Sequence, residues 1–361
     1  MPLPRSRVMP DRPVWAHVVS RCVRKAYLCG GRDGRWEHRR QWVEDRLREL
    51  AGVFAVEIAA YAVMSNHVHV VQRMAPEIAA TWSALEIAER WLLVFGKNAG
   101  RTQLNGDLKA AARALAADAV WVAERRTRLA DLSWFMRAFK EPLARRANAE
   151  EKCSGRFWEG RFVSVPLLDQ AALIACMAYV DLNPVRARMA DTPEQSAYTS
   201  VRQRVRARQR HRAVVRVQTA VAAGTLSATA AADSLQRTGV PDEQRAAAAV
   251  SPESGMFVTP MARCLHPTEK FMEHRPMPLD EYLLLVDLTG RVVRPGKRGA
   301  IDPRLSAILA RLDLKLEAWI ATMTGWRQMH GSGVGAHAQR ADHATSKGVR
   351  WIRNRCALFA A

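Results

Sequence analysis

The spacing of apolar residues divides the first part of the chain into short strands and amphipathic helices. Residues 15–22, W-A-H-V-V-S-R-C, are rich in β-forming side chains and have the length of a strand. In residues 37–52 apolar side chains recur among charged ones and a glycine ends the run, which predicts an amphipathic helix. Two more β-rich runs, 53–64 and 67–73, are separated by a Ser-Asn pair suited to a tight turn. The pattern predicts the order β, α, β, β.

The middle of the chain changes to a helical pattern and then returns to β-type spacing. Residues 77–130 are alanine-rich and predict a helical insertion with a polar break near 100–106. Residues 132–148 predict a further basic helix, and residues 155–165 are typical of a short hairpin or a paired strand segment. Asp169 is a plausible N-cap for the helix that follows.

The later part of the chain is basic and then alanine-rich. Seven arginines lie between residues 202 and 216, six of them at every second position. Two interpretations stay open for this run: a solvated, partly disordered segment, or a contact with nucleic acid. Residues 217–254 predict a linker or loosely packed helices, and a second, mainly helical unit is expected from near Phe257.

Composition narrows the class of protein. Of 361 residues, 55 are Lys or Arg and 35 are Asp or Glu, a formal charge of +20 that favours a polyanionic partner, either nucleic acid or an anionic membrane surface. Because 48% of the residues are hydrophobic, the chain is expected to fold. No run of apolar residues is long enough to span a bilayer, and the first residues lack the pattern of an export signal. Six cysteines without a C-x-x-C pair argue against a disulfide scaffold and predict a cytoplasmic protein.

The residues with the most chemical information are two histidines in Met-Ser-Asn-His-Val-His-Val-Val. On a strand, alternate side chains share a face, so His67 and His69 project together while Val68 and Val70 point into the core. Two imidazoles on one face can bind one divalent metal, although such a pair alone is also common at a sheet edge.

A second group lies in Ala-Tyr-Val-Asp-Leu-Asn-Pro. Tyr179 and Asn183 lie four residues apart, which puts them on the same face of a helix, and Pro184 disfavours its continuation. If this face packs over the histidine strand, a phenol and an amide oxygen come close to the imidazoles. For an isolated Y-x-x-x-N, the commoner arrangement is a half-buried core aromatic, here Tyr179, and a helix-terminating residue before proline, here Asn183.

Four motifs in order resemble the single-tyrosine HUH transposases of insertion sequences, above all the branch of REP-associated tyrosine transposases. They are W-A-H-V-V-S-R-C, Y-A-V-M-S-N-H-V-H-V-V, S-G-R-F-W-E-G-R-F and A-Y-V-D-L-N-P-V-R-A-R-M. The resemblance covers residues 13–75 and 131–205. It implies an α/β (α+β) HUH-endonuclease domain, with a central antiparallel sheet carrying the histidine strand and flanking helices. The helical insertion at 77–130 is longer than the family's usual connection, and the mainly helical C-terminal extension has no counterpart in the family from about residue 217 onward; both are expected from the pattern of this sequence. The expected domains are therefore 1–205 for the transposase domain and, from composition and pattern, 206–256 for a basic, alanine-rich linker and 257–361 for an accessory domain of unassigned role, with DNA binding as one alternative.

The resemblance also implies roles for single residues. His67, His69 and Asn183 would hold Mg²⁺ or Mn²⁺, and Tyr179 would be the nucleophile that cuts single-stranded DNA beside a hairpin and forms a 5′-phosphotyrosine link. The expected partner is single-stranded or hairpin DNA, such as REP-like sequences or insertion-sequence ends, with no membrane, in a bacterial cytoplasm near the nucleoid. A monomer and a homodimer both stay open.

DNA contacts are expected from basic and aromatic residues beside the motifs, since arginine suits phosphate and aromatic rings stack on unpaired bases. These candidates are Arg156, Trp158, Arg161, Arg186, Arg188, Arg202, Arg204 and Arg206, with Phe162 as a second stacking candidate. For each arginine a solvated basic face is an equal alternative, and for the aromatic residues packing is the commoner role.

Two other functions compete with a transposase. A domesticated DNA- or RNA-binding protein would keep the fold and the basic surface without cutting, and a metal-dependent phosphodiesterase would use water in place of a tyrosine.

Overall fold

The computed structural model describes residues 13–31, 34–96, 106–237, 251, 253, 256–264, 277–293, 302–311, 314–326, 333–352, 356 and 358, and every structural statement below refers to these residues. The chain forms two compact units. The first consists of Met1–Val180 and Glu317–Ala361, and the second of Asp181–Leu316. The first unit contains the sheet, whereas the described residues of the second are helical.

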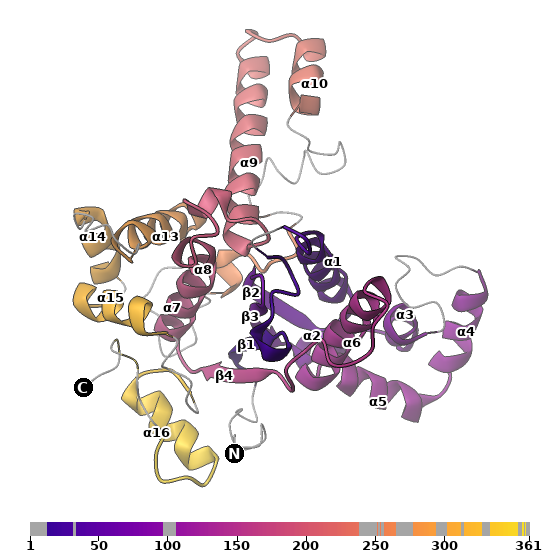
Figure 1. The fold of residues 1–361 in the computed structure, drawn as a ribbon. Helices are drawn as coiled ribbons and strands as arrows, with labels where there is room; N and C mark the ends of the chain where they lie inside the picture. Colours follow the sequence, from indigo (N-terminus) through magenta and orange to yellow (C-terminus); the bar gives the residue numbers. More distant parts are fainter. Residues whose placement is uncertain are drawn as a thin grey trace. The chain divides into compact units, whose positions relative to one another are not determined.

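A four-stranded antiparallel sheet is the centre of the first unit (Figure 1). Its strands are β1 (Trp15–Arg21), β2 (Val56–Val63), β3 (His67–Met74) and β4 (Val163–Leu167), in the order β2-β3-β1-β4. The expectation of an antiparallel sheet flanked by helices is confirmed, and the histidine strand β3 is internal. A short 3-10 helix, η2 (Val23–Lys25), follows β1.

One face of the sheet packs on α1 (His38–Val53) and α6 (Leu132–Glu150), which Figure 1 shows on the same side. Val68 and Val70 are each 1% exposed, as the alternation predicted. Tyr61 shares the face of Val70, directly opposite it on β2, and donates a hydrogen bond to Glu44 Oε1 of α1 at 2.5 Å. This face therefore holds the main apolar core, to which both helices add fully buried leucine and phenylalanine side chains.

The predicted helical insertion consists of α2 (Pro76–Thr81), α3 (Ala84–Phe95), α4 (Gly106–Ala116) and α5 (Ala119–Leu129). Most of the predicted polar break near 100–106 lies outside the described residues. Indole rings and guanidinium groups alternate where α3, α5 and α6 meet: Arg125 lies 5.4 Å from the ring centre of Trp91, and Arg128 lies 4.4 Å from that of Trp134. The aromatic spacing of this segment thus serves helix packing.

The opposite face of the sheet is next to α7 (Gln170–Asp181), and the first unit also contains α15 (Leu316–Gly325) and α16 (His337–Ser346). Asp169 caps α7 as predicted, since its Oδ1 accepts a hydrogen bond from the backbone N–H of Ala172 at 2.8 Å. Its second oxygen accepts the N–H of Ala336 at 2.6 Å. One carboxylate therefore joins the start of α7 to the start of α16.

The second unit contains α8 (Asn183–Arg186), η3 (Pro193–Gln195), α9 (Ser200–Ala222), α10 (Ala228–Arg237), α12 (Met261–Cys264), α13 (Leu279–Val293) and α14 (Pro303–Arg311). The arginine-rich segment expected as part of a linker is helical in α9, which begins at the N-cap Thr199. Its buried positions include Val201, Ala207, Val214 and Val217. These recur at helical spacing between the arginines, so burial of this face stabilises a helix despite its charge.

A buried polar network holds the second unit together around Asp181. Its Oδ2 accepts the hydroxyl of Tyr282 at 2.6 Å, and its Oδ1 accepts Ser200 Oγ and the N–H of Val201, the latter at 3.1 Å. Burial raises the pKa of Asp181, and Arg204 and these hydrogen bonds oppose the rise. Asp181, in the tyrosine motif, thus fixes the start of α9 and the first turn of α13.

Within the residues described, no helix is both long and apolar enough to cross a membrane.

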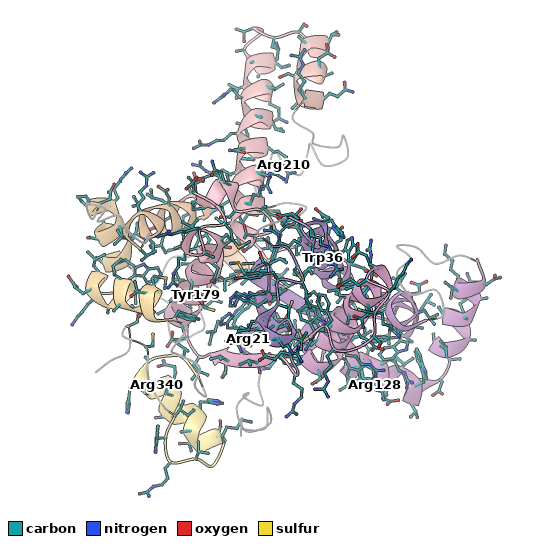
Figure 2. The ribbon with its side chains drawn as sticks, viewed as in Figure 1. Arg21, Trp36, Arg128, Tyr179, Arg210 and Arg340 are labelled. Carbon is teal, nitrogen blue, oxygen red and sulfur yellow. The ribbon has the colours of Figure 1, made fainter. Side chains whose placement is uncertain are left out.

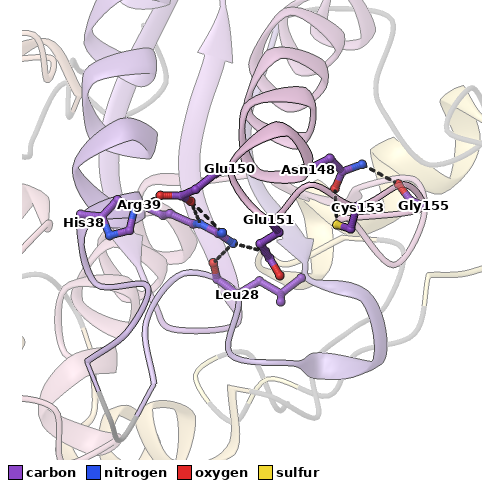
Figure 3. A network of polar contacts seen from close by, with 8 residues as sticks. All are labelled: Leu28, His38, Arg39, Asn148, Glu150, Glu151, Cys153 and Gly155. Atoms are coloured by element: carbon purple, nitrogen blue, oxygen red, sulfur yellow. Dashed lines mark hydrogen bonds and ion pairs between the residues drawn. The ribbon is translucent and has the colours of Figure 1, made fainter.

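A second charged network fastens α1 to the end of α6 (Figure 3). Arg39, 1% exposed, donates from Nε to Glu150 Oε2 at 2.7 Å and from Nη1 to Glu151 Oε1 at 2.7 Å and to the carbonyl of Leu28 at 3.2 Å. Its guanidinium also lies 3.7 Å from the ring centre of Trp36. Burial would raise the pKa of Glu150, but the hydrogen bonds from Arg39 and His38 outweigh it and the pKa is lowered.

We predict that Arg39→Met lowers the free energy of unfolding by about 2–4 kcal/mol, because it removes three charge-assisted hydrogen bonds at a buried position. Urea denaturation measures the loss. Arg48→Met, at a side chain 51% exposed, is the control and should cost under about 1 kcal/mol. Because the pKa of Glu150 is lowered on folding, its contribution is present above the ordinary carboxylate pKa and is lost as the pH falls through the folded-state pKa. The difference in unfolding free energy between wild type and Arg39→Met should therefore shrink at acid pH, while the bond to the Leu28 carbonyl keeps it above zero. A pH-independent difference would contradict this.

We also predict that Tyr282→Phe destabilises the second unit by about 1–3 kcal/mol, since it leaves a buried oxygen of Asp181 without its hydroxyl donor. Tyr27→Phe, at a side chain 59% exposed, should change the unfolding free energy by less than about 0.5 kcal/mol. Equal stability of the two variants would show that the network around Asp181 does not support the fold.

Candidate active site

The pairing of β1 with β3 brings three histidines onto one face of the sheet. Directly opposite residues share a face, and the register pairs Val19 with His69 and Arg21 with His67. Because alternate residues on a strand also share a face, His17 lies on this side as well. The face that does not pack on α1 and α6 therefore carries a polar group at its centre.

The rings of these histidines are in contact. The His67 and His69 ring centres are 4.6 Å apart and nearly perpendicular, at 84°. The His17 and His69 ring centres are 5.0 Å apart and stacked at 20°, with His17 Nε2 at 2.9 Å from His69 Nδ1. His69 is therefore the middle member of a row of three imidazoles.

Tyr179, which Figure 2 labels on α7, lies against this row. Its ring centre is 5.9 Å from that of His69 and 6.1 Å from that of His17, both edge to face. Tyr179 is only 2% exposed. The structure thus brings together three of the sequence-predicted site residues, His67, His69 and Tyr179.

Asn183 lies beyond the helix of Tyr179. α7 ends at Asp181, and Asn183 begins the short α8 in the second unit, where it is buried at 3% exposure. Tyr179 and Asn183 are expected on one continuous helix, but the structure places them on two, α7 and α8. Pro184 explains the break, because proline has no N–H for the helix ladder and its ring restricts the residue before it.

Sequence reasoning missed Trp326, which directly follows α15. Its ring stacks on that of Tyr179 with centres 5.3 Å apart at 25°, and its Nε1 lies 3.5 Å from His17 Nδ1. Trp326 is 3% exposed. No local signal connects residues 309 positions apart. For His17 a signal existed, since the first motif contains it at strand spacing, but the register that makes it a neighbour of His69 is a tertiary property.

The hydrogen bonds of His67 and His69 determine which of their ring nitrogens can bind the expected metal. Asn66 donates from Nδ2 to the carbonyl of Lys25 at 3.1 Å, which directs its Oδ1 toward His67 Nδ1 at 2.6 Å. Neutral His67 therefore donates from Nδ1 and keeps its lone pair on Nε2, the tautomer that a metal ligand needs. His69 is different, because its Nδ1 faces His17. Among the residues that the structure describes, no three His, Cys, Asp or Glu side chains are grouped so as to hold a metal ion.

The predicted DNA-contact residues fall into two groups. Arg156, Arg161, Arg188 and Arg206 are exposed, and Arg186, Arg202 and Phe162 are half-buried. Arg204 is 0% exposed, 3.6 Å from Glu253 and bonded to the carbonyl of Thr259 at 3.1 Å, so in this structure it supports the second unit and cannot reach DNA. Trp158 is 7% exposed and donates its indole N–H to the carbonyl of Lys140 at 2.9 Å, which favours packing over base stacking.

Lys140 itself is unusual. Its Nζ donates to the carbonyl of Gly160 at 2.6 Å and lies 5.6 Å from the ring centre of Trp158. Burial lowers the pKa of Lys140 to about 8. It therefore fastens the third motif to α6 and is a weaker cation than a surface lysine.

The chain was compared with models of protein families, with curated proteins and with solved structures, and none matches it. The resemblance to the single-tyrosine HUH transposases therefore stays a prediction from its four motifs.

Proposed function

We propose that the protein is a metal-dependent endonuclease and strand transferase for single-stranded DNA, a transposase that cuts beside hairpins through a 5′-phosphotyrosine link. The observation that carries the proposal is the cluster of Tyr179 with His69 and His67. The ring centres of Tyr179 and His69 are 5.9 Å apart, and those of His69 and His67 are 4.6 Å apart. The phenol comes from one motif and the two imidazoles from another, and the three groups meet on one face of the sheet. Packing alone does not require three such groups in contact.

The chemistry of Tyr179 follows from a phenol beside a phosphate. Its oxygen attacks phosphorus, the Tyr–O–P bond forms, and the bond between phosphorus and the 3′ oxygen breaks. The phenol loses its proton and the departing 3′ oxygen takes one up, which leaves a free 3′-OH. Since the link conserves the phosphodiester, a 3′-OH can attack it in reverse and rejoin two strands without ATP.

The other residues of the face would hold the phosphate and its counter-ion. His67 and His69 are the proposed imidazole ligands for Mg²⁺ or Mn²⁺, an ion that when bound withdraws charge from the phosphate oxygens. Asn183 belongs to the other unit, and its role as an oxygen ligand rests on the motif resemblance alone. Arg21 is paired opposite His67 and shares its face, so its guanidinium is a candidate for holding a non-bridging oxygen. This residue was not singled out from the sequence.

The DNA would also be bound through α9. This helix contains seven arginines and no acidic residue. Arg208 is bonded to Asp280 at 2.8 Å and Arg204 is buried, which leaves Arg206, Arg210, Arg212 and Arg216 exposed; Figure 2 labels Arg210 on this helix. Like charges four residues apart, as at 206 and 210, destabilise an isolated helix, and a polyanion removes that cost. We therefore propose that α9 contacts DNA phosphates.

Two other functions can be distinguished from this proposal by experiment. A DNA- or RNA-binding protein without cutting activity would use α9 and leave the Tyr179 cluster idle, and a phosphodiesterase using water would cut without a link to protein. The low exposure of Tyr179 bears on access to the site, whichever reaction occurs there.

The proposed covalent link between Tyr179 and DNA can be detected directly. Incubated with end-labelled hairpin DNA carrying single-stranded flanks and with Mn²⁺, the protein should form an adduct that survives denaturing gel electrophoresis. Tyr179→Phe should reduce it at least about a hundredfold, because the nucleophile is gone. Tyr27→Phe, which changes an exposed tyrosine, is the matched control and should leave the adduct unchanged.

The same gel separates the alternatives. Bound but uncut DNA for a broad panel of hairpins would support a binding protein, cut DNA without an adduct would support a phosphodiesterase, and an adduct undiminished in Tyr179→Phe would refute the assigned nucleophile.

The proposed contact between α9 and DNA phosphates can be measured through its salt dependence. Arg206→Gln with Arg210→Gln should weaken binding of hairpin DNA and reduce the slope of log affinity against log salt by about 2, one for each phosphate that the helix no longer neutralises. Arg291→Gln with Arg304→Gln removes two exposed arginines of the same unit, 69% and 67% exposed, that are paired with aspartates. Fluorescence anisotropy over a salt series measures both. Equal slopes for the two double variants would exclude α9 as the DNA-contact helix.

A further inference from the structure

Trp326 covers the proposed nucleophile and contacts the histidine row at the same time. Its indole stacks on Tyr179, and its ring centre is 6.2 Å from that of His17. Both Trp326 and Tyr179 are buried, at 3% and 2% exposure. A phosphate cannot reach a phenol buried to this degree, and Trp326, stacked on its ring, is one of the groups that cover it.

Residues 334–336, later in the chain than Trp326, are bound to the sheet and to the start of α7. Val334 accepts the N–H of Leu168 at 2.8 Å and donates to the carbonyl of Pro166 at 2.9 Å, forming a parallel bridge beside β4. Ala336 then donates to the cap Asp169. Backbone hydrogen bonds and one carboxylate contact thus join residues 334–336 to the end of β4 and the start of α7.

The direction of the hydrogen bonds through the histidine row can be derived from Trp326. An indole nitrogen only donates, so His17 Nδ1, 3.5 Å from it, must be the acceptor. A neutral imidazole has one N–H, which in His17 is then on Nε2 and points at His69 Nδ1, 2.9 Å away. His69 Nδ1 therefore accepts, and the proton of neutral His69 is on Nε2.

This tautomer does not suit a metal. A cation binds the lone pair of a ring nitrogen, and in His69 one nitrogen accepts from His17 while the other carries hydrogen. His67, held by Asn66, has the opposite arrangement with its lone pair on Nε2. With Trp326 docked, one histidine of the pair is set for a metal and the other is not.

The reverse direction is incompatible with Trp326. If His69 donated from Nδ1 to His17 Nε2, its own Nε2 would gain the lone pair that a metal needs. His17 would then carry its proton on Nδ1, where it would face the N–H of Trp326 as donor against donor. A metal-competent His69 and a docked Trp326 thus exclude one another.

We propose that His17 and Trp326 form a switch for this site: docked Trp326 covers Tyr179 and, through His17, holds His69 in the tautomer that excludes a divalent cation. His17 is a positioning residue, acting through His69. Release of the indole exposes the phenol and permits the ligand tautomer together. The metal part of this inference rests on the proposed function, whereas the tautomer and the cover do not.

Two substitutions separate the halves of the switch. Trp326→Phe keeps a ring over Tyr179 and removes the N–H, whereas Trp326→Ala removes both. Mn²⁺ affinity, measured on the full chain by electron paramagnetic resonance of free Mn²⁺, should rise in both variants by roughly three- to tenfold, the equivalent of one ordinary hydrogen bond. Nitration of Tyr179 by tetranitromethane, followed by mass spectrometry, should accelerate strongly in Trp326→Ala and little in Trp326→Phe.

Trp351→Phe is the matched control, since Trp351 belongs to the same unit and is 65% exposed. It should change neither reading. Thermal unfolding checks that each variant is folded. If Trp326→Ala is not folded, the Mn²⁺ measurement on Trp326→Phe alone tests the switch. In metal-free protein with ¹⁵N-labelled histidine, the wild type should show His69 protonated on Nε2, with His69→Asn assigning the signal.

Equal Mn²⁺ affinity in the wild type and Trp326→Phe, no Mn²⁺ binding by any variant, or a wild-type His69 protonated on Nδ1 would each overturn the switch. These failures are distinct from failure of the proposed function. Adduct formation on Tyr179 with unchanged Mn²⁺ affinity would leave the transposase standing without the switch, and tighter Mn²⁺ binding without an adduct would do the opposite.

Discussion

The antiparallel register of β1 on β3 is the constraint on which the site depends. It pairs Val19 with His69, and the alternation of side chains then brings His17 to 2.9 Å from a nitrogen of His69. A slip of one residue would turn the histidines of one strand to the opposite face, into the apolar core. That core fixes the register, because Val68 and Val70 must stay buried against α1 and α6. The hydrophobic face of the sheet thus determines the geometry of the polar one.

The two units use buried charge in the same way, to join segments far apart in the chain. In the first, Arg39 of α1 binds two glutamates at the end of α6, 111 and 112 residues away. In the second, Asp181 joins the start of α9 to Tyr282 of α13. Such groups cost free energy when one partner is removed, so they favour one arrangement over others. α7 contains both Tyr179 and Asp181, so its last turn carries the proposed nucleophile and the buried carboxylate together.

Local sequence pattern predicted most elements of the first unit and the chemical identity of much of the site. The strand alternation of His67 and His69 and the cap at Asp169 are local properties, and the structure has both. The contacts of His17 and Trp326 depend on strand pairing and on a chain return over 309 residues, which no short pattern encodes. The arginine run was ambiguous because its charge suggested a solvated segment, whereas its buried residues at helical spacing form α9. Arg204 looked like its neighbours in sequence, and only the helix phase directs it inward to Glu253.

The central claim is that Tyr179 becomes covalently attached to DNA, and mapping that bond tests it most directly. After reaction with hairpin DNA, nuclease trimming and proteolysis, tandem mass spectrometry should find the nucleotide remnant on the peptide containing Tyr179, attached through its 5′ phosphate. A remnant on any other residue, or cleaved DNA with every tyrosine peptide unmodified, would contradict the account.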